Sequence, residues 1–270
     1  MSLRATVMIP TMAGRAPTLE LALASVLAQN VAEIEVFVMG DGVDDPVREL
    51  VERFGARDDR IRFFDHPKHP SRGEPNRHAA LQDARGHVVC YLCDRDLMLA
   101  HHIETVEELL AEADFCHTFP LRVDRKGELE TFKSSDLRSR ADRRWFVTGW
   151  HHENGIPLSF AAHTLGAYRR LPHGWRETPE GQFTDIYMWQ QFLAERWCRA
   201  RTGYLPTILY FPRYVRRDVT IEAKREELIR WRDRMGAGDW DHTFLKLATE
   251  AIARSQLEFA RRLRSRQPQR

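Results

Sequence analysis

Residues 90–96, with the sequence CYLCDRD, combine two short motifs that point to different chemistry. Cys90 and Cys93 form a C-x-x-C pattern, which is typical of a redox pair or of half a zinc site. Asp94 and Asp96 form a D-x-D pattern, and residues i and i+2 of an extended segment point to the same side. Two such carboxylates can hold a divalent cation against substrate phosphates. The alternative is an acidic start to the following helix, where carboxylates interact favourably with the helix dipole.

The strand that carries the cysteines argues against both cysteine functions. Cys90 lies inside the apolar run HVVCYLC, whereas a redox C-x-x-C opens a helix. Residues i and i+3 of a strand face opposite sides of the sheet, so the two thiols are not expected to meet. Cys116 and Cys198 have no Cys or His companion at zinc-finger spacing. The cysteines are therefore expected in the core, and the two acids are the stronger candidates for chemistry.

The elements that position these acids alternate between strand and helix, which predicts parallel βαβ units in the first half of the chain. Strands are predicted at 4–10, 33–40, 60–65 and 87–94, and helices at 18–29, 46–54, 74–86 and 101–113. The second half is less regular, with strands at 114–124 and 128–135, a helix at 184–197, an edge strand at 206–216 and helical sequence from residue 220.

Ligands of an open α/β sheet bind beyond the carboxyl ends of its strands. The loops at 10–15, 40–45, 66–77 and 93–96 are therefore the expected site. Asp41 stands between two glycines in one of them, which fits either an acid that reaches into the crevice or an ordinary surface turn.

The composition excludes several classes of protein. Of 270 residues, 43% are hydrophobic and 30% are charged, which indicates a soluble globular protein rather than a disordered or fibrous one. The formal net charge of +2 gives no strong field for nucleic acid. No apolar run is long enough to cross a bilayer and the N-terminus has no secretion-signal pattern, so a cytoplasmic protein is expected. Clustered C-terminal arginines indicate a solvated helix end, with weak membrane-surface contact as the alternative: Arg261, Arg262, Arg264, Arg266 and Arg270.

Two long stretches resemble the family 2 glycosyltransferases with the GT-A fold. Residues 7–45 are similar to that family's opening strand, Pro-Thr loop, helix and second strand with its Asp-Gly turn, and residues 77–96 to its helix end and D-x-D strand. The resemblance covers residues 5–110 well and extends loosely to about 215. It implies a Rossmann-like, mixed, mostly parallel sheet flanked by helices, in a domain at 1–215 with a nucleotide-sugar half (1–100) and an acceptor half (101–215). A C-terminal helical extension is expected at 216–270.

The resemblance also implies a role for each matched residue. Asp94 and Asp96 would hold Mg²⁺ or Mn²⁺. Asp185 falls on the Asp of the family's Glu-Asp pair, with Thr184 on the Glu, which makes Asp185 the implied catalytic base. Donor binding falls to residues of the loops and of the late strand: Pro10, Thr11, Arg15, Asp41, Arg77, Asp94, Arg95, Arg213 and Arg216, with Arg217 as an alternative to the last two.

The D-x-D pattern departs from the family in its register. Family members usually show D-x-D-D, and alignment on the following helix places Cys93 and Arg95 on its first and third positions. Asp94 and Asp96 then occupy the second and fourth. Either the loop is shifted by one residue, or metal binding is weaker and Arg95 supplies positive charge itself.

The implied reaction is an inverting, metal-assisted transfer of a sugar from a nucleotide-diphospho-sugar to the hydroxyl group of a saccharide, lipid-linked or small-molecule acceptor. A sugar-phosphate nucleotidyltransferase is the first alternative, although IPTMAGRAP has one glycine where that class has a Gly-rich loop. A GT-A-like nucleotide-binding module without transferase activity is the second. No G-x-G-x-x-G follows the first strand, which disfavours a dehydrogenase.

Acceptor contacts are predicted from polar and aromatic residues of the second half: His151, His152, Glu153, His163 and Trp175. Adjacent histidines do not face one point and these have no partner at i+4, so they are not expected to bind metal. Aromatic rings stack well on sugars, but tryptophan is also a common core residue.

Overall fold

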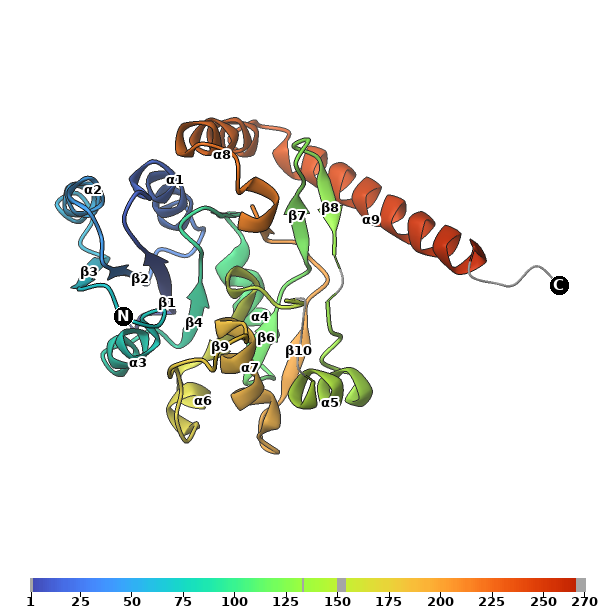
Figure 1. Cartoon of the computed structure of the whole chain (residues 1–270), viewed down its shortest axis with the longest axis horizontal. Helices are drawn as coiled ribbons and strands as arrows, with labels where there is room; N and C mark the ends of the chain where they lie inside the picture. Colours follow the sequence, from blue (N-terminus) through green and yellow to red (C-terminus); the bar gives the residue numbers. More distant parts are fainter. Residues whose placement is uncertain (1, 133, 150–153, 266–270) are drawn as a thin grey trace.

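A central sheet organises the computed structural model, which describes residues 2–132, 134–149 and 154–265, with side chains as far as residue 257. In this described part of the chain, seven strands pair in the order β10-β6-β9-β4-β1-β2-β3 (Figure 1). Their bounds are β1 (Ala5–Thr11), β2 (Ile34–Asp41), β3 (Ile61–His66), β4 (Val88–Tyr91), β6 (Phe115–His117), β9 (Ala161–Thr164) and β10 (Ala200–Thr202).

The sheet is mixed and mostly parallel. β1 pairs in parallel with β2 and β4, β2 with β3, and β6 with β10, whereas β9 runs antiparallel between β4 and β6. The four strands predicted for the first half are confirmed, and β1 and β2 are buried along almost their whole length because helices cover both faces of the sheet. The predicted fold class is therefore confirmed.

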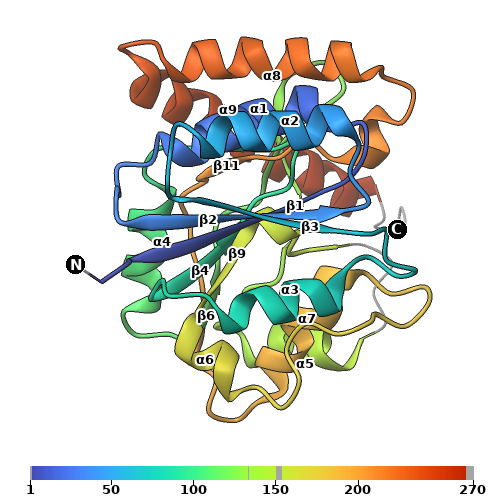
Figure 2. The same ribbon diagram turned by 90° about the vertical axis from the view of Figure 1, so that its left-hand side faces the viewer.

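Two helical layers enclose the sheet (Figure 2). Alternate residues of β1 divide between them: Val7 and Ile9 pack into the core under α1, α2 and α4, whereas Met8 packs into the core under α3, α5, α6 and α7. The helices on the first face are α1 (Ala16–Leu27), α2 (Asp45–Gly55) and α4 (His102–Leu110). Those on the second are α3 (Glu74–Gln82), α5 (Arg140–Thr148), α6 (Leu165–Arg170) and α7 (Thr184–Ala194).

Several short elements lie outside the central sheet. They are the pair β5 (Leu97–Met98) and β11 (Ile208–Leu209), the hairpin β7 (Leu121–Val123) and β8 (Leu129–Thr131), and the 3₁₀ turns η1 (Leu158–Phe160) and η2 (Arg213–Arg216). The predicted strand at 206–216 is shorter than expected. It is limited to Ile208 and Leu209, because Pro212 cannot donate to a ladder and a 3₁₀ turn follows it.

The last two helices, α8 (Ile221–Met235) and α9 (Trp240–Ser265), pack against the main body. Leu228 and Trp231 of α8 share a core with Leu21 of α1, and Phe244 of α9 shares it with Leu129 of β8. The predicted boundary at 215/216, between the main domain and the helical extension, stays a prediction, because this hydrophobic core contains residues from both sides of it. No helix in the described residues is long and apolar enough to span a membrane. The side chains of the C-terminal arginine cluster lie outside the described residues.

The cysteines are unpaired, and three of them are buried core residues as predicted: Cys90, Cys116 and Cys198. Cys93 is partly buried, and burial raises the pKa of its thiol to about 12. A thiol with such a pKa stays neutral near pH 7, so Cys93 is not an activated nucleophile.

Candidate active site

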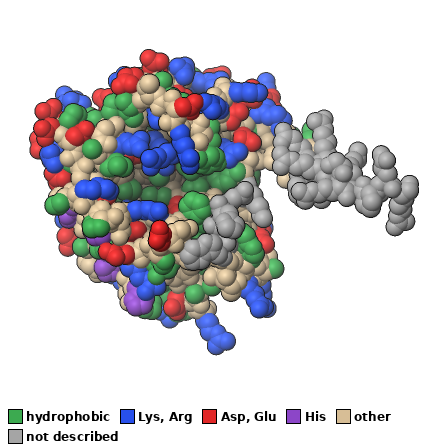
Figure 3. All heavy atoms as spheres, viewed as in Figure 1, with side chains coloured by type: hydrophobic (Ala, Val, Ile, Leu, Met, Phe, Trp, Pro, Cys, Tyr) green, Lys and Arg blue, Asp and Glu red, His purple; other side chains and the backbone are tan. Residues whose placement is uncertain are grey.

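A cavity of about 1930 Å³ opens beside the loops that follow β1 and β4. Its walls come from these loops, α3, the start of α7, the β7–β8 hairpin, η2, α8 and α9. Lysine and arginine side chains gather along the hollow on this face of the molecule (Figure 3). The volume exceeds the roughly 300–1,000 Å³ of a typical small-ligand site. The cavity therefore has room for two substrates side by side.

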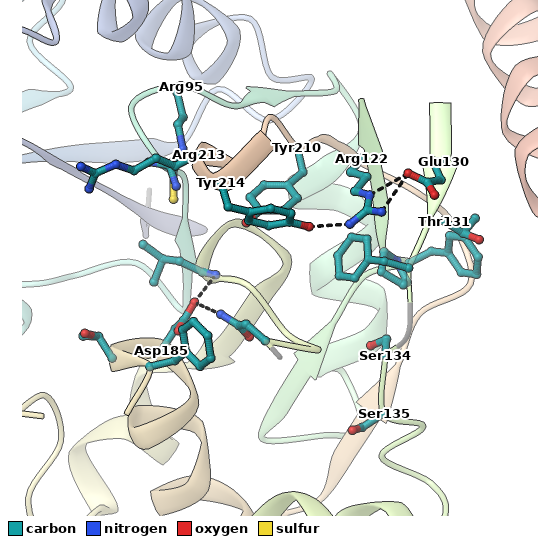
Figure 4. Close-up of a pocket in the computed structure, with 18 of the residues that line it drawn as sticks. Arg95, Arg122, Glu130, Thr131, Ser134, Ser135, Asp185, Tyr210, Arg213 and Tyr214 are labelled. Carbon is teal, nitrogen blue, oxygen red and sulfur yellow. Dashed lines mark hydrogen bonds and ion pairs between the residues drawn. The ribbon is translucent and has the colours of Figure 1, made fainter. Parts of the chain in front are cut away.

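Asp185 lies in the first turn of α7 and on the wall of this cavity. Its Oδ2 accepts hydrogen bonds from Asn154 Nδ2 at 2.6 Å and from the Leu158 backbone N–H at 3.0 Å (Figure 4). Its Oδ1 accepts one from the adjacent Ile186 backbone N–H at 3.1 Å. These bonds fix the orientation of the carboxylate and leave Oδ1 with capacity to accept another proton donor.

Burial raises the pKa of Asp185, and the hydrogen bonds from Asn154 and from backbone amides oppose that shift. A carboxylate with a raised pKa is a stronger base, and a general base works best when its pKa approaches the operating pH. Asp185 therefore combines a position on the cavity wall with the basicity needed to remove a proton from a hydroxyl group.

Arg95 reaches the cavity from the loop after β4, whereas in the described structure neither acid beside it does. Asp94 lies behind the wall, where its Oδ2 accepts a hydrogen bond from Thr11 Oγ1 at 3.2 Å and lies 3.8 Å from Arg15 Nε. Its Oδ1 lies 3.7 Å from an Nη atom of Arg95. Asp94 thus positions two guanidinium groups at the cavity.

Asp96 is fully buried and joins three segments of the chain. Its Oδ2 accepts a hydrogen bond from the Ser159 hydroxyl at 2.5 Å, and its Oδ1 accepts one from the Phe211 backbone N–H at 2.9 Å. The Ser159 hydroxyl in turn accepts from the Cys93 backbone N–H at 2.9 Å. Both carboxylate oxygens therefore hold together the loops that form the cavity.

The donor set of the D-x-D pattern does not fit a divalent cation. A Mg²⁺ site uses carboxylate oxygens that face the substrate phosphates. Here the oxygens of Asp96 are bonded to protein groups, and Asp94 faces two guanidinium groups. Within the described ranges, no three His, Cys, Asp or Glu side chains come together as metal ligands. Mg²⁺ or Mn²⁺ at Asp94 and Asp96 stays a prediction.

Asp41, at the end of β2, is held by the segment that follows β3. Its Oδ2 forms an ion pair with Lys68, and its Oδ1 accepts a hydrogen bond from the His69 backbone N–H at 2.6 Å. Pro10 and Thr11 end the neighbouring strand β1. Asp41, Pro10 and Thr11 are not part of the described cavity wall, so the structure leaves their predicted role in donor binding untested.

Arg77 and Trp175 line the cavity as a stacked pair, with the guanidinium carbon 4.6 Å from the centre of the indole ring. The indole N–H of Trp175 donates to the Tyr91 hydroxyl at 3.0 Å. Arg77 and Trp175 are almost fully buried, with 6% and 2% of their surface exposed. They therefore form a floor of the cavity, and Trp175 presents little surface to an acceptor.

His163, another predicted acceptor residue, is not part of the described cavity wall. His163 lies in β9 and is fully buried, with Nδ1–H donating to the Thr164 carbonyl and Nε2 accepting from the Tyr91 hydroxyl, at 3.0 and 2.8 Å. It points into the core because β9 lies in the interior of a sheet that helices cover on both faces. His151, His152 and Glu153 lie outside the described residues.

The buried state of His163 predicts a pH dependence of stability. Burial lowers the pKa of His163 to about 4, below the value of about 6.5 for an unfolded histidine. The unfolded chain therefore takes up a proton that the folded protein refuses, and stability falls as the pH drops from 6.5 towards 4. At pH 5 the loss from this residue is about 2 kcal/mol. Chemical denaturation at pH 7 and at pH 5 measures the loss of stability between these two pH values. We expect this loss to be about 2 kcal/mol smaller in His163→Gln than in the unaltered protein. Equal losses in the two proteins contradict a buried, neutral His163.

The arginines of η2 and the residue after it differ in whether their side chains already bond to other protein groups. Arg216 forms a two-point ion pair with Glu227, at 2.6 and 2.7 Å, and donates to the carbonyls of Val123 and Asp124. Arg213 and Arg217 are exposed on the cavity wall. Of the two arginines predicted to bind the donor, Arg213 is thus available to a ligand, whereas Arg216 is engaged in structure.

Three further residues contribute to the site, and none of them was singled out from the sequence. Only one of the three lies in a loop where the site was expected. Arg72 lies in a predicted site loop, and its Nη1 donates to the Thr184 hydroxyl at 2.6 Å beside Asp185. Asn154 orients Asp185, and Lys224 of α8 reaches the cavity wall. Neither belongs to a motif, since only the folded chain brings them close to the strand loops.

The mixed, mostly parallel sheet, with a cationic cavity beside its strand-end loops, has the GT-A fold expected from the sequence, which the alignment with solved structures supports. The family model described as Glycosyl transferase family 2 matches residues 6–173. The chain therefore belongs to glycosyl transferase family 2, in agreement with the resemblance of its strand and loop motifs.

The individual proteins to which this chain is similar share low sequence identity with it and are longer than it. A Campylobacter jejuni GalNAc(5)-diNAcBac-PP-undecaprenol beta-1,3-glucosyltransferase is 27% identical over 125 residues, which cover 46% of this chain and 40% of that enzyme. The structure of S. aureus TarS aligns with a TM-score of 0.58 at 17% identity, over 89% of this chain and 41% of TarS. The mannosyltransferase PcManGT from Pyrobaculum calidifontis, in complex with GDP-Man and Mn²⁺, aligns with a TM-score of 0.52 at 18% identity, over 78% and 57%. The chain thus spans less than two thirds of each.

Proposed function

We propose that the protein transfers a sugar from a nucleotide-diphospho-sugar to an acceptor hydroxyl group, with inversion at the anomeric carbon. The observation that supports this most is one cavity with a carboxylate on one wall and several cations on another. Asp185 lies apart from Arg95 and Arg213, with the space between them open (Figure 4). A base for an acceptor and cations for a diphosphate are the two groups that such a transfer requires.

The proposed step is a single displacement. Asp185 takes the proton of the acceptor hydroxyl, whose oxygen forms a bond to the anomeric carbon. The bond from that carbon to the donor diphosphate breaks, and its electron pair leaves with the nucleoside diphosphate. Attack from the face opposite the leaving group inverts the configuration. Charge therefore grows on the diphosphate, where positively charged side chains stabilise the transition state.

The acceptor is proposed to occupy the part of the cavity between α7 and the β7–β8 hairpin. Exposed aromatic side chains line this part, including Tyr204 and Tyr214, which are 58% and 55% exposed. Arg122 is oriented beside Tyr214 by Glu130 and by the Tyr214 hydroxyl (Figure 4). Exposed aromatic faces suit a saccharide. The Campylobacter relative is named for a lipid-linked acceptor, so saccharide and lipid-linked acceptors are the classes to test first.

The donor test measures release of nucleoside diphosphate from a panel of activated sugars. UDP-GlcNAc and GDP-Man belong in it because two structural relatives were solved with them, and UDP-glucose because the Campylobacter relative is a glucosyltransferase. We expect one donor to give acceptor-dependent release, with an inverted anomeric configuration of the product by NMR. Nucleotide binding without release favours the binding module, and release of pyrophosphate from a nucleoside triphosphate favours the nucleotidyltransferase.

A further inference from the structure

A recess beside the main cavity gathers five cations from four parts of the chain. They come from the loops after β1 and β4, from η2 and from α8: Arg15, Arg95, Arg213, Arg216 and Lys224. The same five side chains line the main cavity, so the recess is continuous with the candidate active site. Lys224 belongs to a helix outside the residues 6–173 that the family model matches.

These cations are not balanced by acids. The charge of Arg216 is paired with Glu227, whose carboxylate it meets at two points. Asp94 is shared by Arg15 and Arg95 at the long distances of 3.8 and 3.7 Å. Among the described residues, neither the side chain of Arg213 nor that of Lys224 forms a hydrogen bond or ion pair. Positive charge is therefore in clear excess at this point of the cavity.

The excess is unfavourable until an anion binds. Burial lowers the pKa of Lys224, and the charges of Arg15, Arg213, Arg95 and Arg216 lower it further. Like charges held this close repel one another, and partial burial strengthens the repulsion. A polyanion relieves it and gains charge-assisted hydrogen bonds from guanidinium and ammonium groups. The recess is thus built for an anionic ligand with several negative charges.

We propose that Arg15, Arg95, Arg213 and Lys224 bind the diphosphate of the donor and stabilise the leaving group without a divalent cation. This inference rests on the proposed function and names the groups that act at its diphosphate end. It accounts for the D-x-D segment, where Asp94 orients Arg15 and Arg95 and Asp96 anchors the loop. It also gives α8 a role in catalysis, because Lys224 completes the cation set.

The test is isothermal titration calorimetry with UDP and GDP, first in EDTA and then in Mn²⁺. We expect the preferred nucleotide to bind in EDTA with nearly the affinity that it has in Mn²⁺. Lys224→Met and Arg95→Met should each weaken binding in EDTA by about tenfold, the effect of losing one charge-assisted hydrogen bond. Arg230→Met is the matched control, because Arg230 is exposed on the same helix and lies away from the cavity. Circular dichroism should show that all three variants are folded.

The outcomes separate this inference from the proposed function. Binding that disappears in EDTA, returns with Mn²⁺ and is insensitive to Lys224→Met overturns the cation site and leaves the transferase proposal standing. Failure to bind either nucleotide in EDTA and in Mn²⁺ overturns both. Metal-independent binding that Lys224→Met and Arg95→Met weaken, but Arg230→Met does not, supports both.

Discussion

Asp185→Asn is expected to lower kcat by about 10²–10⁴-fold, the usual contribution of a positioned general base, while nucleotide affinity stays nearly unchanged. An asparagine side chain keeps the size of the original and can still accept the hydrogen bonds that Asn154 and Leu158 donate to Asp185. It cannot take up the acceptor proton, because an amide is a very weak base. The loss should therefore fall on turnover and not on donor binding. Steady-state kinetics and calorimetry on the same preparation measure the two effects.

Asp241→Asn is the matched control, since Asp241 also lies in the first turn of a helix, α9, and is exposed. It removes the same charge from the same helical position away from the cavity, so its kcat should equal that of the unaltered protein. An Asp185→Asn variant with full turnover contradicts the base assignment. A variant that loses nucleotide affinity as strongly as turnover places Asp185 at the donor instead.

Sequence patterns predicted the strands whose signal is local. β1 and β2 are mostly apolar, interrupted by Thr6 and Glu35, and end at a turn or a proline, which is how strands buried on both faces appear in a sequence. β9 carries no such signal in its four residues AAHT. It becomes a strand because β4 and β6 lie on either side of it and bond to it from distant parts of the chain. Pairing of this kind is a property of the folded sheet.

The site was predictable as a set of loops but not as a set of side-chain directions. The loops after β1 and β4 do border the cavity, through Arg15 and Arg95. Which of three consecutive residues faces the cavity depends on how its loop is anchored, and Asp96 is anchored by Ser159 and the Phe211 backbone. Neither partner is near Asp96 in sequence. The acids of the D-x-D pattern were therefore recognisable, whereas their inward orientation was not.

Glu227→Ala is expected to destabilise the protein by about 3 kcal/mol, in the range measured for breaking a buried ion pair. The side chains of Arg216 and Glu227 are 5% and 15% exposed, and they meet at two points. Removing the carboxylate leaves Arg216 charged and unpaired beside Arg15, Arg213 and Lys224, so repulsion adds to the cost of desolvation. Urea denaturation followed by circular dichroism measures the change.

The double variant Arg216→Met/Glu227→Leu should recover most of that stability, because two apolar side chains leave no buried charge unpaired. Recovery distinguishes an unpaired charge from a simple loss of packing, which the double variant would not repair. Asp233→Ala provides the control on the same helix, since its ion pair with Arg232 is half exposed or more on both sides and exposed pairs contribute little. If Glu227→Ala is no more destabilising than Asp233→Ala, the pair does not hold α8 against η2, and Lys224 is positioned by other contacts of α8, such as the packing of Leu228 and Trp231 and the ion pair of Arg225 with Glu20.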